Sequence, residues 1–169
     1  KDLTDEVIGL FATLPSLMPA LHLPVQSGSN RILSAMNRRY TREHYLGLIE
    51  KLRRARPDIA LSTDIIVGFP GETEENFMDT YRLVEEVGYS QVFTFIYSKR
   101  EGTPAAEMDD DTPREVIQER FDRLVDLVQR KAFEANQAEL GATVPVLVEG
   151  TSKRDDSILA GKSPKNQTV

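Results

Sequence analysis

Apolar residues in this chain follow two different spacings, and the two alternate along its first 140 residues. Short strand-like runs lie at residues 21–27, 60–67 and 92–97, and the last two are rich in β-branched and aromatic side chains. Amphipathic stretches with helical spacing lie at residues 5–14, 41–55, 74–87 and 112–135. Strands that alternate with helices predict an α/β fold with a parallel sheet and right-handed crossovers.

Capping residues mark where two of these helices begin. Thr73 stands directly before the third helical stretch and is typical of an N-cap. For the longest helix, Thr112 and Glu115 predict a capping box, with Pro113 at the first helical position. The predicted buried face of that helix comprises Ile117, Phe121, Leu124, Val128, Ala132 and Ala135.

The first two strand-like runs each have one apolar and one polar face. The polar faces carry His22, Pro24 and Gln26 in the first run and Ser62 and Asp64 in the second. A parallel sheet covered by helices on both sides reads as continuously apolar, so a polar inner face favours a barrel whose lumen binds a polar ligand. We therefore predict about three β/α units of a TIM-like partial barrel, with the ligand at the C-terminal mouth of the strands.

The pattern changes near residue 141. Residues 143–149 alternate between apolar and polar at period two, residues 150–156 are polar and predict a turn, and residues 158–161 begin another short strand. This arrangement is typical of the start of a small antiparallel β-barrel. The predicted organisation is therefore a β/α segment at residues 1–140 and a short β segment at residues 141–169.

Composition limits the chemistry that this chain can perform. Its 169 residues include no cysteine and only two histidines, which excludes disulfides and thiolate-bound metal and leaves no metal cluster to predict. No apolar run approaches the length that spans a bilayer, and no signal peptide is visible at the start, so we expect a cytoplasmic protein without a membrane partner.

The net charge of −6 hides an uneven distribution. Residues 31–56 contain eight Lys or Arg and two acidic residues, whereas residues 72–126 contain fifteen acidic and six basic residues. Arg38 and Arg39 follow a short predicted helix and are placed to contact phosphate or carboxylate groups. The cluster at residues 53–56 ends a helix, where cations favour the helix dipole, and we interpret it as solvated.

Four segments, in this order, resemble the radical S-adenosylmethionine (radical SAM) methylthiotransferases. They are LHLPVQSGSNRIL at residues 21–33, MNRRYT at 36–41, TDIIVGFPGET at 63–73 and FIYSKREGTPA at 95–105. The resemblance is greatest to the MiaB-type branch, which adds a methylthio group to isopentenyladenosine next to the tRNA anticodon. The tail from Val144 resembles the start of that family's TRAM domain, a small β-barrel that binds RNA.

The resemblance also implies parts that are absent from this sequence. In that family a Cys-x-x-x-Cys-x-x-Cys loop holds the catalytic 4Fe-4S cluster, and an N-terminal domain holds a second cluster on three further cysteines. None of these cysteines is present, so the resemblance implies the C-terminal half of a radical SAM barrel followed by a truncated TRAM segment. We expect this segment to be inactive alone, with clusters only in the full-length protein.

The resemblance places an S-adenosylmethionine site at the strand ends. Its predicted residues are Gln26, Ser27, Ser62, Asp64, Gly68, Phe69, Pro70, Gly71, Glu72 and Tyr97. The loop at residues 68–72 is expected beside the adenine, because its glycines permit close approach and its proline stiffens the turn. Gln26 and Ser27 either contact the ribose or the methionine carboxylate, or cap the turn after the strand.

Other roles are assigned more sparingly. Asp64 requires a partner, either the ligand or a structural serine, arginine or backbone group, because a carboxylate in a barrel is costly when unpaired. His22 is interpreted as a hydrogen-bonded lumen residue. Arg38, Arg39 and Arg100 are the predicted substrate-binding residues. No catalytic residue is predicted.

Two other functions remain open at this level. The first is the sister enzyme that methylthiolates an aspartate of a ribosomal protein, and the second is a non-catalytic remnant that binds a nucleoside or RNA. The favoured function has tRNA and S-adenosylmethionine as its partners. A partial barrel also leaves strand edges open, which predicts self-association of this segment through edge pairing.

Overall fold

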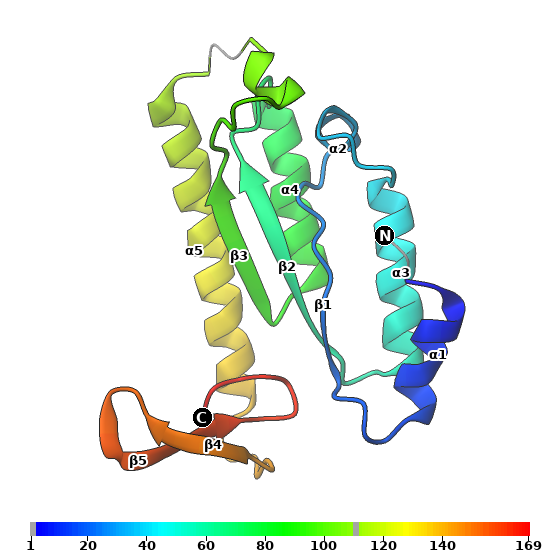
Figure 1. Ribbon diagram of the computed structural model, residues 1–169, viewed down its shortest axis with the longest axis vertical. Coiled ribbons are helices and arrows are strands. Elements are labelled where there is room, and N and C mark those ends of the chain that lie inside the picture. The colour runs from blue at the N-terminus through cyan, green and yellow to red at the C-terminus, as the bar shows by residue number, and fades with distance from the viewer. Residues whose placement is uncertain (1–2, 110–111) are drawn as a thin grey trace.

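The computed structural model describes residues 3–109 and 112–169 (Figure 1). Its larger sheet has three parallel strands in the order β1–β2–β3, which are β1 (Ala20–His22), β2 (Ala60–Val67) and β3 (Gln91–Ile96). The helices that connect these strands are α2 (Asn30–Ala35), α3 (Arg42–Ala55) and α4 (Glu74–Val87). The predicted alternation of strands and helices and the parallel sheet are confirmed.

The remaining elements flank this core. Helix α1 (Asp5–Thr13) precedes β1 and packs on α3, and the long helix α5 (Arg114–Ala138) packs on β3, β2 and α4. A short 3-10 helix, η1 (Pro104–Glu107), lies between β3 and α5. The chain then forms an antiparallel hairpin of β4 (Leu147–Ser152) and β5 (Asp155–Lys162) beyond the end of α5 (Figure 1). Within residues 3–109 and 112–169, no helix is both long and apolar enough to cross a membrane.

Burial differs sharply between the two faces of the sheet. On β2 the alternate residues Leu61, Thr63, Ile65 and Val67 are each at most 2% exposed, because α4 and α5 lie behind this face (Figure 1). We call the other side the open face; its residues are His22, Ser62, Asp64, Ile66, Phe93 and Phe95. Phe95 is 51% exposed, so the open face is more apolar than the first two strands alone predicted.

Two helical boundaries follow local backbone chemistry. Thr73 caps α4 as predicted, because its hydroxyl accepts a hydrogen bond from the Asn76 amide in a reciprocal capping box. The start of α5 was predicted one residue too early. Pro113 has ψ 142° and occupies the N-cap position outside the helix, the position that the sequence had assigned to Thr112. Ala135, predicted to be buried, is exposed near the C-terminal end of α5.

Two strand predictions also require correction. Regular pairing of β1 ends at His22, with one further bridge from Gln26 to Ile65, because Pro24 lacks an amide hydrogen and Gln26 has φ 72°. In the tail, most of the predicted turn at residues 150–156 is strand, since β4 continues through Gly150 to Ser152. The pairing of β4 with β5 shifts register between Val148 and Gly150, so the strand continues past Gly150. The alternation of apolar residues does not reveal such a shift.

Candidate cofactor and substrate site

The loop that follows β2 is stabilised by a hydrogen bond between its first residue, Gly68, and the carboxylate of its last residue, Glu72. Gly68 and Gly71 have φ values of 73° and 75°, a left-handed conformation that glycine adopts without steric cost. Glu72 is only 3% exposed, and its Oε2 atom accepts a hydrogen bond from the Gly68 amide at 2.8 Å. We call residues 68–72 the glycine loop. Its shape therefore depends on both glycines and on the carboxylate of Glu72.

Two arginines from different helices hold the glycine loop from outside. Arg31 of α2 donates to the carbonyl oxygen of Gly71, and Arg120 of α5 donates to that of Glu72 at 2.9 Å. Arg120 is 6% exposed and also pairs with Glu74 at 3.1 Å. The sequence interpretation did not include Arg120, although an arginine three residues after Ile117, on the apolar face of a helix, was a usable signal.

Burial raises the pKa of Glu72 from 4.5 to about 7. The Gly68 amide and the guanidinium groups of Arg120 and Arg31 lower this pKa, and the nearby Glu74 carboxylate raises it further. Desolvation outweighs the cations because the side chain lies almost entirely out of water. The glycine loop consequently contains a carboxyl group that changes its charge close to neutral pH.

We expect Glu72→Gln to flatten the pH dependence of stability between about pH 4.5 and 7. The raised pKa favours folding fully below the unfolded value of 4.5, and this advantage is lost as the pH rises through about 7. Between pH 5 and pH 8 the unaltered protein should therefore lose about 2 to 3 kcal/mol of stability that Glu72→Gln does not lose. Urea unfolding of both proteins near pH 5 and near pH 8 measures it, with the exposed Glu75→Gln as the control. If the stability of Glu72→Gln changed with pH as much as that of the unaltered protein, Glu72 would not be the group with the raised pKa.

A histidine links the two predicted polar residues of β2 on the open face. His22 Nδ1 lies 3.0 Å from Ser62 Oγ, and His22 Nε2 lies 3.5 Å from Asp64 Oδ2. The imidazole ring also meets the ring of Phe93 edge-on, with centroids 5.9 Å apart. The protein partner of Asp64 is therefore His22, which was not among the partners considered for it, and the interpretation of His22 as hydrogen-bonded agrees with this geometry.

The structure gives Gln26 and Ser27 a buried environment. Ser27 is fully buried, its Oγ lies 3.2 Å from Thr80 Oγ1, and it accepts a hydrogen bond from the Ser29 amide. Gln26 is 9% exposed. The Ser27 hydroxyl thus holds the turn against α4, which is the capping alternative left open above.

Tyr97 contacts the glycine loop through Phe69. Their rings meet edge-on with centroids 5.1 Å apart, and Phe69 is only 5% exposed. The hydroxyl of Tyr97 is buried, and no atom of the described residues forms a hydrogen bond with it. A buried hydroxyl without a partner costs free energy, so a ligand that accepts its hydrogen bond is favoured here. Arg100, by contrast, is exposed beyond the end of β3.

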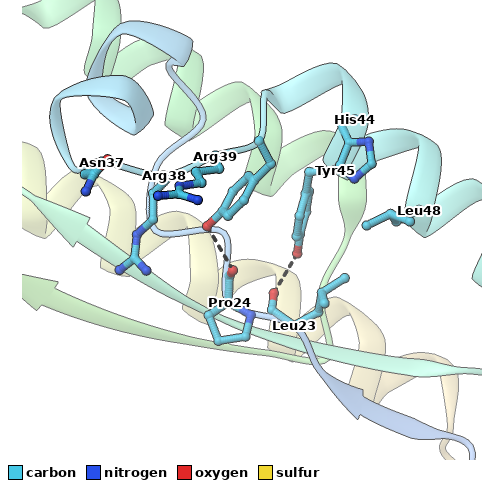
Figure 2. A pocket seen from close by; sticks show the side chains of 9 residues that line it. Leu23, Pro24, Asn37, Arg38, Arg39, His44, Tyr45 and Leu48 are labelled. Carbon is cyan, nitrogen blue, oxygen red and sulfur yellow. Dashed lines mark hydrogen bonds between the residues drawn. The ribbon is translucent and has the colours of Figure 1, made fainter. Parts of the chain in front are cut away.

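Arg38 and Arg39 line a cavity of about 410 Å³ between the chain after β1 and helix α3 (Figure 2). Both arginines lie in the connection between α2 and α3, as predicted. Tyr40 of the same connection is half-buried, and desolvation raises the pKa of its hydroxyl while the Arg38 charge opposes that shift. The cavity shares no residue with the cluster on the open face, because its walls come from the chain after β1, the connection between α2 and α3, and α3 itself.

Comparison with known proteins identifies the class. The family model for the radical SAM superfamily matches residues 2–84. Among solved structures, the chain resembles the radical SAM enzyme coproporphyrinogen III oxidase (HemN) from Escherichia coli, with a TM-score of 0.63 and 17% identity. That match covers 78% of this chain and 30% of the enzyme, and it shows a shared fold. Over residues 2–84, the chain is therefore similar to members of the radical SAM superfamily.

Closer relatives identify the branch. The chain is 52% identical over its whole length to the tRNA-2-methylthio-N(6)-dimethylallyladenosine synthase of Streptomyces viridosporus, and covers 34% of that protein. The same enzyme of Thermobifida fusca is 51% identical, and that of Carboxydothermus hydrogenoformans is 52% identical, with 35% and 38% of their lengths covered. The chain thus spans about a third of the length of these curated relatives. The resemblance to the methylthiotransferases is confirmed.

Proposed function

We propose that this chain is part of a radical SAM methylthiotransferase that adds a methylthio group to N6-isopentenyladenosine next to the tRNA anticodon. The observation that supports this most directly is the identity of about one half, over the entire chain, to enzymes named for that product. Their names favour tRNA over a ribosomal protein as the substrate. A tRNA substrate also favours the cytoplasm as the place of action.

We infer that S-adenosylmethionine binds across the open face and the glycine loop. The face offers an imidazole that lies 3.0 Å from a hydroxyl and 3.5 Å from a carboxylate, and these groups suit the amino, carboxylate and hydroxyl groups of this molecule. The glycine loop has exposed backbone at Gly71, and the hydroxyl of Tyr97 has no partner among the described residues. These residues fit the cofactor.

Each residue has a distinct task in this proposal. Asp64 and Ser62 orient hydroxyl or amino groups of the cofactor, and Tyr97 donates a hydrogen bond from its buried hydroxyl. Phe69, which is itself buried, supports the Tyr97 ring. When bound beside a reduced iron-sulfur cluster, S-adenosylmethionine supplies one-electron chemistry that removes hydrogen from an unactivated carbon.

The iron-sulfur clusters do not fit this chain. It contains no cysteine, and no set of three or more His, Asp or Glu side chains in the described part of the chain could hold a metal ion. We therefore assign no cluster ligand and no catalytic residue here.

Residues 1–140 remain our proposed part of the radical SAM barrel, residues 141–169 the proposed TRAM segment, and the isolated segment is proposed to be inactive. Self-association through its sheet edges is testable by sedimentation.

The test uses the complete protein that contains this segment, reconstituted with iron and sulfide. It is incubated with S-adenosylmethionine and tRNA that carries isopentenyladenosine, and mass spectrometry of the digested nucleosides detects methylthio transfer. Failure to modify tRNA under conditions that cleave S-adenosylmethionine would refute the proposal. Product on a ribosomal protein instead would favour the sister activity.

Asp64→Asn tests the cofactor assignment within that assay. Loss of a charged hydrogen-bond acceptor is expected to raise KM for S-adenosylmethionine by about 10- to 100-fold. The control is Asp58→Asn, because Asp58 pairs with Arg56 at the protein surface, with 58% of its side chain exposed. Equal KM values for the two variants would show that Asp64 does not contact the cofactor.

A further inference from the structure

The cavity beside α3 combines an apolar floor with a positively charged rim. Leu23, Pro24 and Leu48 contribute apolar surface, and the side chains of Asn37 and His44 lie at its edge with the two arginines (Figure 2). None of the lining residues is acidic. A volume of about 410 Å³ lies within the range of about 300 to 1,000 Å³ that is usual for small-molecule sites.

The other six Lys or Arg side chains of residues 31–56 each form an ion pair or a hydrogen bond, whereas no such partner is found for the two arginines of this cavity within the described residues. Arg42 pairs with Glu86, Arg54 with Glu50 and Arg56 with Asp58. Arg38 and Arg39 are exposed, and neither forms an ion pair with any residue in the described ranges. Guanidinium groups without a carboxylate partner are suited to bind phosphate oxygens.

The aromatic surface of the cavity is held in a defined orientation. The Tyr40 hydroxyl donates to the carbonyl oxygen of Val25 at 3.2 Å, and the Tyr45 hydroxyl donates to that of Leu23 at 2.8 Å. Tyr45 is 3% exposed, whereas Tyr40 is half-buried and retains ring surface that a ligand can contact. A ring fixed at its hydroxyl end offers a base a stacking surface with little loss of side-chain entropy.

We propose that this cavity binds one nucleotide of an RNA strand, with its phosphate on Arg38 and Arg39 and its base against Tyr40. This inference rests on the proposed function, which makes RNA the substrate. The connection from α2 to α3 and the glycine loop lie at the same end of the sheet (Figure 1). One RNA strand can therefore reach both, so the nucleotide in the cavity is a neighbour of the modified base.

The experiment measures the affinity of the complete protein for a fluorescent anticodon stem-loop RNA by anisotropy, at several salt concentrations. Arg38→Gln combined with Arg39→Gln is expected to reduce affinity and to lower the slope of log K against log salt by about 0.7 for each lost phosphate contact. Tyr40→Leu is expected to weaken binding about tenfold without changing that slope.

Matched variants separate this site from general electrostatic attraction. Arg54→Gln removes one positive charge, half of the change in the double variant, from the far end of α3, where the side chain is 70% exposed, and should leave affinity nearly unchanged. Tyr40→Phe retains the ring but loses the hydrogen bond to Val25, so it should weaken RNA binding less than Tyr40→Leu does. Thermal unfolding confirms that each variant is folded.

Three results would overturn the proposal. These are absence of RNA binding by the unaltered protein, equal losses in the double arginine variant and Arg54→Gln, and no effect of Tyr40→Leu. If inorganic polyphosphate displaced the RNA equally well from the unaltered protein and from Tyr40→Leu, the cavity would be a charged surface only, without a site for a base. Methylthio transfer is measured separately: loss of RNA affinity in the variants without any transfer by the unaltered protein would support the site and refute the proposed enzyme.

Discussion

Gly28→Ala is expected to lower the free energy of unfolding by about 4 kcal/mol, which is above the usual cost of overpacking of about 1 to 3 kcal/mol. A Cβ atom at Gly28 would lie 2.5 Å from the carbonyl oxygen of Asp79 and 2.6 Å from Thr80 Cα. Both are backbone atoms of α4, so no side-chain rotation relieves the overlap. The Gly28 amide also donates to Thr80 Oγ1 at 2.9 Å, and moving the turn away would break this buried bond.

Urea unfolding followed by circular dichroism measures this effect. With an m value of about 2 kcal/mol per molar urea, the midpoint should fall by about 2 M. The control is Gly47→Ala in α3, where nothing lies within 4 Å of the added methyl group. That variant should gain about 0.5 to 1 kcal/mol, because alanine favours helix more than glycine. A midpoint for Gly28→Ala within error of the unaltered protein would show that the turn can move freely.

Arg120→Leu is expected to cost about 3 to 5 kcal/mol near pH 8, because it leaves the buried Glu72 without its nearest cation. The guanidinium group is 7% exposed, donates to the Glu72 carbonyl at 2.9 Å and stands 4.0 Å from its carboxylate. Without this charge the pKa of Glu72 should rise above its value of about 7. The loss should therefore be smaller near pH 5, where Glu72 is protonated.

Unfolding experiments at both pH values test this dependence. Arg130→Leu is the control on the same helix, since Arg130 is 56% exposed and its pairing distance to Glu85 is 3.9 Å. Adding Glu72→Gln to Arg120→Leu should recover part of the lost stability near pH 8, because the double variant has no buried charge to compensate. A loss that is the same at both pH values, with no recovery in the double variant, would show that Arg120 acts through packing alone.

These two positions support the backbone around the cofactor site that we propose. Gly28 allows the turn after β1 to pack directly on α4, and Arg120 holds the carbonyl at the end of the loop. A loop whose backbone is already held in place loses little entropy when a ligand binds. Variants at either position should therefore weaken cofactor binding as well as stability.

Local sequence signals located most of the helices and strands. Thr73 and the acidic residues after it placed the start of α4 correctly, because a cap is satisfied within a few residues of itself. The second strand was also located correctly, since its alternation matches the burial of β2. Where backbone geometry overrode the pattern, as at Gln26 with φ 72° and at Pro113, the predicted boundary was wrong.

The sequence by itself determined the class of fold, the position of the glycine loop and the absence of thiolate ligands, because periodicity, turn residues and composition are properties of neighbouring residues. Only the tertiary structure decided that His22 partners Asp64, that Arg120 stabilises the glycine loop and that Arg38 and Tyr40 share a cavity. His22 and Asp64 lie on different strands, Arg120 and the glycine loop on different elements, and the cavity beside Arg38 and Tyr40 is closed by α3 and by the chain after β1. Their contacts depend on how helices pack on the sheet, which no local pattern specifies.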